Sequence, residues 1–347
     1  MSEQLVEVKD LKVTYYQNGV ETPVVRNVSF EIKKNETLGL VGESGSGKSV
    51  TSKAIMRLIA EPPGKIANGE ILFEGKNLLK MKEKQMQKVR GKDIAMIFQE
   101  PMTSLNPLYT CGSQIAEAIL LHNKCSKQEA WERAVEILKM VGVPSPEKRA
   151  QSYPHELSGG MRQRVMIAIA LSCNPRLLIA DEPTTALDPT IQAQILKLIH
   201  DMQKEKDMSV LLITHDMGIV AENCDRVAVM YAGQILEIAD VKTIFGNPAH
   251  PYTIGLLKAI PKLDEKVDRL YNIRGMVPRF NELPNGCTFG PRCDFCDKKC
   301  EEEAPQLVNM GDGHLVRCHY AGYLPERGIL FNGKTAGSQT FEKIFPC

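Results

Sequence analysis

The feature that most constrains this chain is a glycine-rich segment that fits the pattern G-x-x-x-x-G-K-[ST], namely Gly42-Glu43-Ser44-Gly45-Ser46-Gly47-Lys48-Ser49. It follows the apolar run LGLV, which begins at Leu38, and it precedes a stretch with a helical pattern from Lys48 to Ile59. In a strand–loop–helix of this kind, glycines let backbone N–H groups surround phosphate oxygens, and the helix N-terminus adds its positive end. The segment predicts a nucleotide site in which Lys48 reaches the β- and γ-phosphates and Ser49 binds Mg²⁺. A serine- and glycine-rich turn that matches by chance is the alternative, and the flanking strand and helix argue against it.

Continuous apolar runs alternate with helical patterns along the chain. Leu177–Ala180 and Val210–Thr214 are both short, apolar and bounded by polar residues. Such runs are typical of parallel strands that are covered on both faces, so we expect an α/β core. Near the N-terminus, VEVKDLKVTYY and VVRNVSFEI alternate apolar and polar residues on either side of the turn signal Gln17-Asn18-Gly19, which predicts an antiparallel β element.

A helical insertion is predicted at about residues 108–172. Apolar residues recur at helical spacing from Gly112 to Val141, and Ser126 with Glu129 forms a capping box at the start of the second helix. After Ala249 the proline content rises and the periodicity fades. We therefore expect a first domain over 1–250, a small loop-rich unit with many cysteines over 251–330, and a polar tail over 331–347.

Two acids end one of the apolar runs, in the segment LLIADE. Asp181 and Glu182 would lie at the carboxyl edge of a parallel sheet, where ligands bind in doubly wound folds. Asp181 could hold Mg²⁺ through water, and Glu182 could polarise an attacking water molecule. A strand that simply ends in solvated charges is the alternative for such a pair taken alone, and the phosphate loop makes it the weaker one.

A second candidate anion site precedes the helical stretch Val165–Ser172. Ser158-Gly159-Gly160 offers a hydroxyl and free N–H groups at a helix N-terminus, although ordinary helix capping would explain them as well. Two phosphate-binding helix starts in one chain suggest sites that are shared between two subunits.

Five motifs in order make the chain resemble an ABC transporter ATPase subunit over about residues 5–325: the 42–49 loop, Gln99, the LSGGM segment 157–161, the LLIADE strand with the 186–188 turn, and His215. Four further segments are similar to the ATPases of bacterial oligopeptide/dipeptide importers, namely FQEPMTSLNPL (98–108), EPTTALDPTIQAQIL (182–196), HPYT (250–253) and NGCTFGPRC (285–293). The resemblance implies an ATPase with a P-loop NTPase fold.

The resemblance also implies roles for single residues. Tyr16 would stack on adenine, with Tyr15 as its competitor, and Gln99 would touch Mg²⁺ and couple the nucleotide to the membrane subunit. His215 would hold the γ-phosphate and the attacking water. Ser158, Gly159 and Gly160 would contact ATP held mainly by the opposite subunit, with Asp188 at the seam. The ATP contacts would come from Gly42, Ser44, Gly45, Ser46, Gly47, Lys48, Ser49, Val50, Gln99, Asp181, Glu182 and His215; of these, Ser49, Gln99 and Asp181 would serve Mg²⁺, and Glu182, His215, Lys48 and Gln99 would serve catalysis.

The implied partners are those of an importer on the cytoplasmic face of a bacterial membrane. They are a second ATPase subunit (F-type in a heterodimer, or a second copy), two transmembrane permease subunits and an extracellular peptide-binding protein. As the resemblance implies, ATP would close the paired subunits and hydrolysis would let them open. Two alternatives stay open: the ATPase of a nickel or glutathione importer, and a non-transport ABC ATPase with a metal-sensing module. The segment after Gln99 favours transport, because the family docks a permease helix there.

The chain has 10 cysteines, and five of them crowd near the C-terminus. Cys287, Cys293, Cys300 and Cys318 follow the spacing C-x5-C-x6-C-x17-C, with Cys296 between the second and third. Clustered thiolates suit zinc or an iron–sulfur cluster, and spacing alone does not choose between them. The family resemblance implies a [4Fe-4S] cluster on these four residues, with zinc, or free or disulfide-bonded thiols, as alternatives. Cys296 would be a bystander or an alternative ligand.

Charge and composition exclude some other classes. With 43 Lys+Arg against 42 Asp+Glu, the chain has a formal net charge of +1, so it carries no global electrostatic footprint of a nucleic-acid-binding protein. No apolar stretch approaches the roughly 18 residues of a membrane span. We therefore expect membrane contact only through the permeases.

Overall fold

The structure is a computed structural model that describes residues 3–17, 19–100, 104–185, 187–260 and 271–321. These residues divide into two compact units, and each unit is described here by itself. The first unit comprises the described residues of Met1–Leu5, Ile32–Glu36 and Asn77–Ile213, and the second comprises those of Val6–Glu31, Thr37–Lys76 and Thr214–Cys347. Residues 101–103 of the expected permease-docking segment, Ala186 of the 186–188 turn, and the expected polar tail lie outside the described residues.

Three parallel strands form the sheet of the first unit: β6 (Ile94–Ile97), β7 (Leu177–Asp181) and β8 (Ser209–Thr214). Ile97 pairs with Ala180, and Asp181 pairs with Ile213. Every residue of these strands is buried, which explains why they are continuous apolar runs rather than alternating ones. The parallel strands predicted at 177–180 and 210–214 are therefore confirmed.

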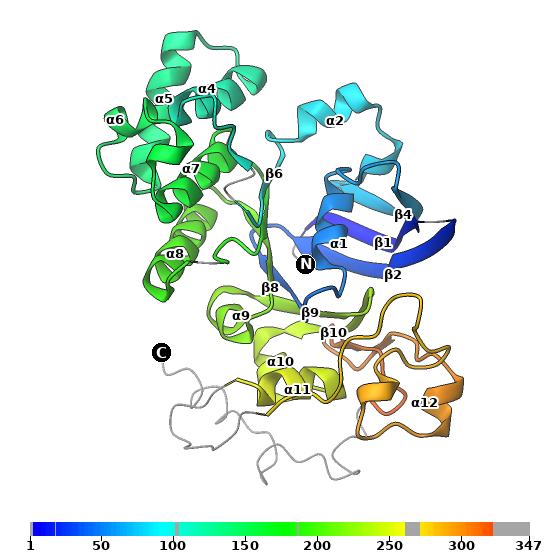
Figure 1. Cartoon of the computed structure of the whole chain (residues 1–347). Helices are drawn as coiled ribbons and strands as arrows, with labels where there is room; N and C mark the ends of the chain where they lie inside the picture. The colour runs from blue at the N-terminus through cyan, green and yellow to red at the C-terminus, as the bar shows by residue number, and fades with distance from the viewer. Residues whose placement is uncertain (1–2, 18, 101–103, 186, 261–270, 322–347) are drawn as a thin grey trace. The chain divides into compact units, whose positions relative to one another are not determined.

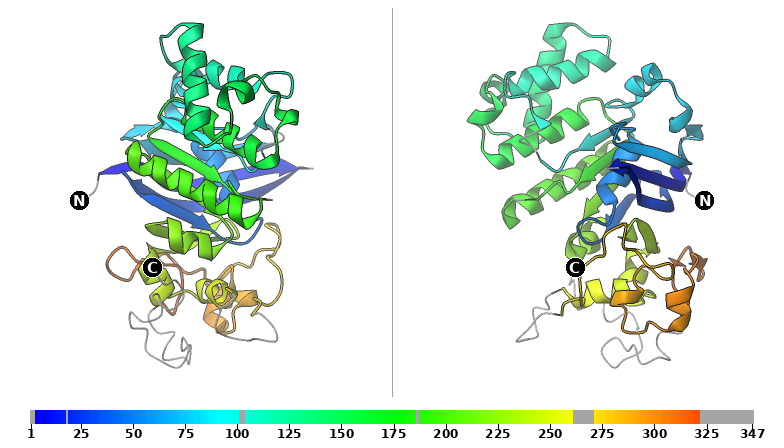
Figure 2. Two further views of the ribbon diagram at one scale, coloured as in Figure 1. Left: turned by 90° about the vertical axis from the view of Figure 1, so that its left-hand side faces the viewer. Right: turned by 45° about the vertical axis from the view of Figure 1, so that its right-hand side comes forward.

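Helices make up most of the remainder of the first unit, and α4 and α5 lie side by side in every view (Figure 2). The predicted capping box is present at the start of α5, where Ser126 Oγ accepts from the Glu129 N–H and Glu129 accepts from the Ser126 N–H. The helices are η1 (Leu78–Lys80), α2 (Glu83–Val89), α4 (Cys111–His122), α5 (Lys127–Met140), α6 (Pro146–Ala150), η2 (Pro154–Glu156), α7 (Gly159–Leu171) and α8 (Pro189–Glu205).

One sheet of the second unit has the strand order β2-β1-β4-β5, and α1 lies beside it (Figure 1). Its members are β1 (Gln4–Gln17), β2 (Val20–Lys33), β4 (Gly64–Phe73) and β5 (Lys76–Asn77), and β1 runs antiparallel to β4. Helix α1 spans Lys48–Ile55. The helix predicted to reach Ile59 is therefore too long, because Arg57 adopts a left-handed φ of 50° that ends the helical path.

A further set of strands in the second unit carries the C-terminal segment. Parallel strands β3 (Thr37–Val41) and β9 (Arg226–Tyr231) are followed by the antiparallel strands β10 (Gln234–Asp240), β12 (Leu315–Val316) and β11 (Val308–Asn309). The helices are α9 (Met217–Asn223), α10 (Val241–Gly246), α11 (Pro251–Lys258), η3 (Gly290–Arg292) and α12 (Lys298–Glu302).

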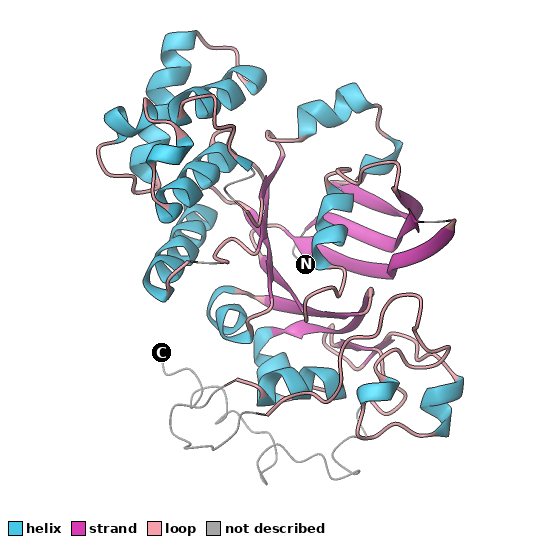
Figure 3. Cartoon of the chain, viewed as in Figure 1, coloured by secondary structure: helices cyan, strands magenta, loops and turns pink. Residues whose placement is uncertain are grey.

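Residues 271–321 are mostly loop, as the sequence predicts (Figure 3). They are nevertheless packed: Phe289 and three of the cysteines share one apolar core with β9, β10 and α11. Among the helices of the described residues, none has both the length and the hydropathy that a membrane crossing requires.

Candidate functional site

The glycine-rich loop joins β3 to α1 within the second unit, as the motif requires. Gly42 and Gly47 have φ values of 154° and 102°, which side-chain-bearing residues rarely adopt. A Cβ on Gly42 would also lie 2.0 Å from the Met230 carbonyl oxygen. Ser44 and Gly45, between them, are exposed. The loop therefore requires glycine at positions 42 and 47, and its middle is exposed where a phosphate would approach.

Lys48 begins α1, and its side chain turns back into the loop. It is only 5% exposed, and its Nζ donates to the carbonyl oxygens of Gly42 at 2.7 Å and Glu43 at 3.0 Å. Ser46 Oγ lies 3.5 Å from the same nitrogen. An ammonium group held against the loop by these carbonyl oxygens is placed to neutralise the charge of a bound phosphate. Ser49 and Val50 follow it in the first turn of α1.

A glutamine and a glutamate from distant parts of the first unit meet at the ends of β6 and β7. The Gln99 side-chain amide donates to Glu182 Oε2 at 2.9 Å, and the Thr185 hydroxyl donates to the same oxygen at 2.9 Å. Asp181, the last residue of β7, is buried with 2% exposure. The structure thus brings Gln99 together with Glu182, the residue next to Asp181, and the predicted Mg²⁺ and water site on these residues stays a prediction.

Glu182 is held in an uncommon backbone conformation. Its φ is 47°, and its N–H donates to the Ile213 carbonyl oxygen at 3.0 Å. A left-handed glutamate is unfavourable and persists only where its surroundings enforce it, which often happens at functional sites. Here the hydrogen bond to the end of β8 supplies that enforcement.

Gln163 is a residue that the sequence analysis did not single out. It lies in α7, is only 2% exposed, and its side-chain amide donates to the Pro183 carbonyl oxygen at 2.6 Å. This contact joins the helix that follows the LSGGM segment to the residue after Glu182. Gln163 lies between Arg162 and Arg164 in the sequence, so no local pattern marked it as a buried residue.

The LSGGM segment starts α7 as predicted. Ser158 caps the helix by accepting from the Met161 N–H at 3.4 Å. A Cβ on Gly159 would meet no atom within 4 Å, whereas one on Gly160 would lie 3.3 Å from Ile191. The exposed helix start can accept an anion, and ordinary capping is present at the same time.

The other predicted site residues are placed on different elements. His215 is exposed directly after β8, Tyr16 is 46% exposed near the end of β1, and Asp188 caps α8 by accepting from the Ile191 N–H at 3.0 Å. The loop 42–49, Tyr16 and His215 belong to the second unit, and Gln99, Asp181, Glu182, Asp188 and the LSGGM segment belong to the first. The predicted site residues therefore divide into two groups, one in each unit, and within these groups a contact is seen between Gln99 and Glu182 and within the 42–49 loop.

The four predicted cluster cysteines line one pocket in the second unit. Cys287, Cys293, Cys300 and Cys318 surround it together with Phe289, Phe295 and Tyr320, and Cys296 is not among the lining residues. The pocket wall also contains His250, Pro251, Gly290 and His319. No disulfide joins the cysteines within the described ranges. These four are the cysteines that the family resemblance implies as ligands, and their role stays a prediction.

Backbone N–H groups point at two of these sulfurs. The Phe295 N–H donates to Cys293 Sγ and the Tyr320 N–H donates to Cys318 Sγ, each at 3.4 Å. Burial raises the pKa of Cys293 to about 12 and that of Cys318 to about 11. Within residues 3–17, 19–100, 104–185, 187–260 and 271–321, no three or more His, Cys, Asp and Glu side chains are arranged to hold a metal ion. The structure therefore shows a cysteine-lined pocket and does not show the expected metal unit.

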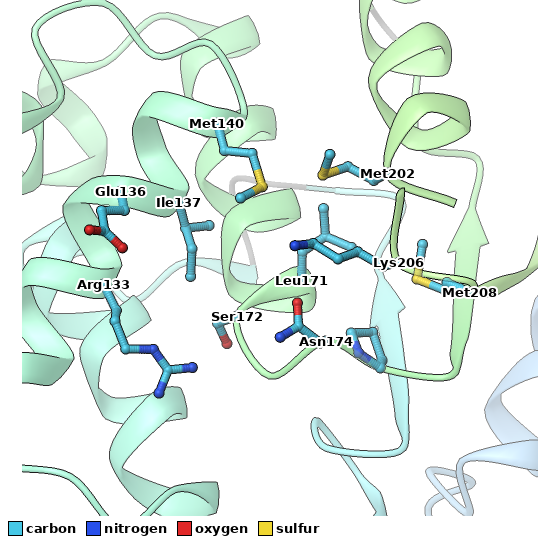
Figure 4. A pocket seen from close by; sticks show the side chains of 11 residues that line it. Arg133, Glu136, Ile137, Met140, Leu171, Ser172, Asn174, Met202, Lys206 and Met208 are labelled. Atoms are coloured by element: carbon cyan, nitrogen blue, oxygen red, sulfur yellow. The ribbon is translucent and has the colours of Figure 1, made fainter. Parts of the chain in front are cut away.

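A separate cavity of about 170 Å³ lies in the first unit, and none of the predicted site residues lines it. Met140, Met202 and Met208 lie around it, with Arg133, Glu136 and Lys206 at its polar parts (Figure 4). Nothing in its lining resembles the chemistry of the two site groups.

Comparison with known proteins identifies the family of this chain. The family described as "ABC transporter" matches residues 25–185, and the family described as "Oligopeptide/dipeptide transporter, C-terminal region" matches residues 236–300. The Oligopeptide transport ATP-binding protein OppD of Bacillus subtilis (strain 168) is 55% identical over 315 residues, which are 90% of this chain and 88% of that protein. This chain belongs to the ATP-binding subunits of oligopeptide/dipeptide ABC transporters.

Other relatives of this ATP-binding subunit agree with that family. The Dipeptide transport ATP-binding protein DppD of Haemophilus influenzae is 49% identical over 315 residues, covering 91% of this chain and 95% of the relative. A solved dimer of the ATP-binding cassette MJ0796, in a post-hydrolysis state bound to ADP and Pi, matches with a TM-score of 0.62 and 29% identity, covering 68% of this chain and 98% of that one. The predicted ABC ATPase fold is thereby confirmed, and the chain is an ATPase.

Proposed function

We propose that this ATP-binding subunit powers the import of peptides through a bacterial ABC transporter. It would work at the cytoplasmic face of the membrane with a second ATPase subunit, two permease subunits and an external peptide-binding protein. The observation that carries the proposal is the 55% identity to an oligopeptide transport protein over 90% of the chain. The match of residues 236–300 to the peptide-transporter C-terminal region favours peptides over nickel or glutathione.

The phosphate loop would bind the triphosphate. Backbone N–H groups of residues 42–49 would surround its oxygens, and Lys48 would exchange its carbonyl partners Gly42 and Glu43 for phosphate oxygens. Tyr16 would stack on the adenine ring, since it is exposed near the end of β1. Ser49, Gln99 and Asp181 would hold Mg²⁺, which when bound would neutralise phosphate charge.

Glu182 would orient and deprotonate the attacking water. The Gln99 amide and the Thr185 hydroxyl already donate to its carboxylate, so the carboxylate is oriented before the reaction begins. His215 would hold the γ-phosphate. A partner subunit would complete the site with its own LSGGM segment, in the way that the exposed Ser158 and Gly159 of this chain would complete the partner's.

We also propose that the cysteine-lined pocket holds a [4Fe-4S] cluster through Cys287, Cys293, Cys300 and Cys318. Four thiols on one pocket and N–H donors to two of the sulfurs are the donor set that such clusters take. The position of Cys296 outside the pocket lining supports its role as a bystander. Such a cluster would stabilise the loops around it and could carry an electron, and zinc on the same thiols is the alternative.

Peptide uptake into proteoliposomes tests the function. The subunit is co-purified with its permease partners, reconstituted, and supplied with Mg·ATP on its own face and a labelled peptide with the binding protein on the other. We expect uptake that requires hydrolysis and is absent with Glu182→Gln. Uptake of Ni²⁺ or glutathione in place of peptide would overturn the substrate assignment, and hydrolysis with no co-purifying permease would overturn the transport role.

A further inference from the structure

The second residue of the phosphate loop is held by a side chain from the cysteine segment. Arg292 forms a forked ion pair with Glu43, with Nη1 to Oε2 at 2.6 Å and Nη2 to Oε1 at 3.1 Å. The two residues are 249 positions apart in the sequence. Forked guanidinium–carboxylate pairs fix orientation as well as charge. The pair therefore fixes the direction of the Glu43 side chain relative to the cysteine segment.

Arg292 is itself rigidly placed. Its side chain is 4% exposed against 32% for Glu43, its Nε donates to the Arg274 carbonyl oxygen at 2.9 Å, and its guanidinium lies 5.6 Å from the centre of the Tyr231 ring. Burial acts to lower the pKa of Arg292, but its hydrogen bonds and the Glu43 charge outweigh burial and raise it above the usual value. A buried, oriented guanidinium of this kind is a fixed anchor and not a mobile surface charge.

A second contact to Glu43 comes from the same part of the chain. The Glu43 backbone N–H donates to the Tyr252 hydroxyl at 2.9 Å. The Tyr252 ring packs against Phe289 and Tyr231, with ring centres 5.3 Å and 4.8 Å away. Phe289 lies between Cys287 and Cys293 in the chain, so the cysteine segment supports both contacts to Glu43.

The carbonyl oxygen of Glu43 also accepts from Lys48 Nζ, at 3.0 Å. Glu43 is thus held at three points: its N–H by Tyr252, its side chain by Arg292 and its carbonyl oxygen by Lys48. A shift of Glu43 would change the position of the loop and of the lysine that meets the phosphates.

We propose that Arg292 is a positioning residue for the phosphate loop, through which the cysteine segment sets the affinity of this chain for ATP. The inference rests on the ATP site of the proposed function. Without Arg292, Glu43 would leave an unpaired carboxylate beside incoming phosphates and a loop that must be ordered when ATP binds. Both effects weaken nucleotide binding more than the chemical step.

A double-mutant cycle in the full-length chain tests the proposal. The affinity for Mg·ATP is measured by calorimetry, and KM and kcat by phosphate release, for the wild type, Glu43→Gln, Arg292→Gln and the double variant. We expect each single variant to raise Kd and KM about tenfold and kcat to fall by less than KM rises; the double variant should be no weaker than the weaker single variant, because both remove one interaction.

Arg279→Gln is the matched control. Arg279 is an exposed arginine of the same unit, and within the described residues no hydrogen bond or ion pair joins its side chain to Glu43 or Arg292, so we expect wild-type affinity. If Arg292→Gln does not fold, Glu43→Gln still tests the proposal. Glu43 lies on a partly exposed loop, so its substitution should be tolerated by the fold. Wild-type affinity in Glu43→Gln, single effects that multiply, or a double variant restored to wild type would overturn the proposal. A wild-type chain that does not bind Mg·ATP would instead refute the ATP site itself.

Discussion

The side-chain amide of Gln99 donates a hydrogen bond to the Glu182 carboxylate across 2.9 Å, although 83 positions separate the two residues. Gln99 follows β6 and Glu182 follows β7, and these strands pair in parallel. The contact joins the residue expected to respond to the permease to the residue expected to activate water. Under the proposed function, a displacement of Gln99 would therefore change the orientation of the Glu182 carboxylate.

Replacing Gln99 with alanine should slow hydrolysis more than it weakens binding. Without the amide, the Glu182 carboxylate loses the donor that lies 2.9 Å from its Oε2, and misplacement of a catalytic group by about 1 Å can cost about 100-fold in rate. Phosphate release at saturating Mg·ATP measures the effect. Gln128→Ala, which removes an exposed amide from α5, is the control and should retain wild-type turnover. A Gln99→Ala protein with unchanged kcat would contradict the role given to this contact.

Gly42→Ala should abolish ATP binding and destabilise the second unit, whereas Gly45→Ala should be milder. Both positions have positive φ, but only a Cβ on Gly42 meets a backbone atom, the Met230 carbonyl oxygen at 2.0 Å. A left-handed alanine alone costs about 1–2 kcal/mol, and the clash adds to this at Gly42. Urea unfolding and ATP calorimetry on both variants measure the difference. Equal effects at the two positions would show that the loop backbone is not confined as described.

Gln163→Leu should lower both stability and turnover. The substitution leaves the Pro183 carbonyl oxygen without the amide donor seen at 2.6 Å, and an unsatisfied buried polar group costs about 1–3 kcal/mol. Because Pro183 directly follows Glu182, we expect kcat to fall as well. Gln87→Ala, which removes an exposed glutamine of α2, is the control for stability. Loss of stability with full turnover would reduce Gln163 to a structural residue.

Cys293→Ser and Cys296→Ser should differ in metal content. Cys293 lines the cysteine pocket and accepts an N–H from Phe295, and Cys296 is outside the lining. Anaerobically purified wild-type and Cys296→Ser proteins should be brown and contain iron and sulfide, and Cys293→Ser should lose both. Colourless wild-type protein with stoichiometric zinc would contradict the cluster and show that zinc occupies these thiols. Loss of iron in Cys296→Ser would make Cys296 a ligand.

Local patterns predicted much of the fold and of the site. The phosphate loop, the strand ending in Asp181 and the capping box of Ser126 and Glu129 depend on neighbours within a few residues, so their sequence signals are strong. The end of α1 at Ile55 was mispredicted, because the helical pattern continues while Arg57 takes a left-handed conformation. Helix α11 was hidden in a proline-rich stretch in which a proline occupies the first helical turn.

Contacts between distant segments could not be predicted in the same way. Arg292 and Glu43 are ordinary charged residues in their local sequence, and only the packing of the cysteine segment beside the loop pairs them. The amide of Gln163 is a similar case, since its carbonyl partner is a backbone atom and leaves no trace in the residue types. For the same reason, the roles assigned to Tyr16, His215 and Asp188 stay predictions.

The most direct test of the account is a paired measurement of ATP binding and ATP hydrolysis in the wild type and Glu182→Gln. In the proposed mechanism the Glu182 carboxylate activates water, and the loop and Lys48 hold the phosphates. We predict that Glu182→Gln binds Mg·ATP at least as tightly as the wild type and releases no phosphate in the steady state. Steady-state hydrolysis retained in Glu182→Gln would contradict the assignment.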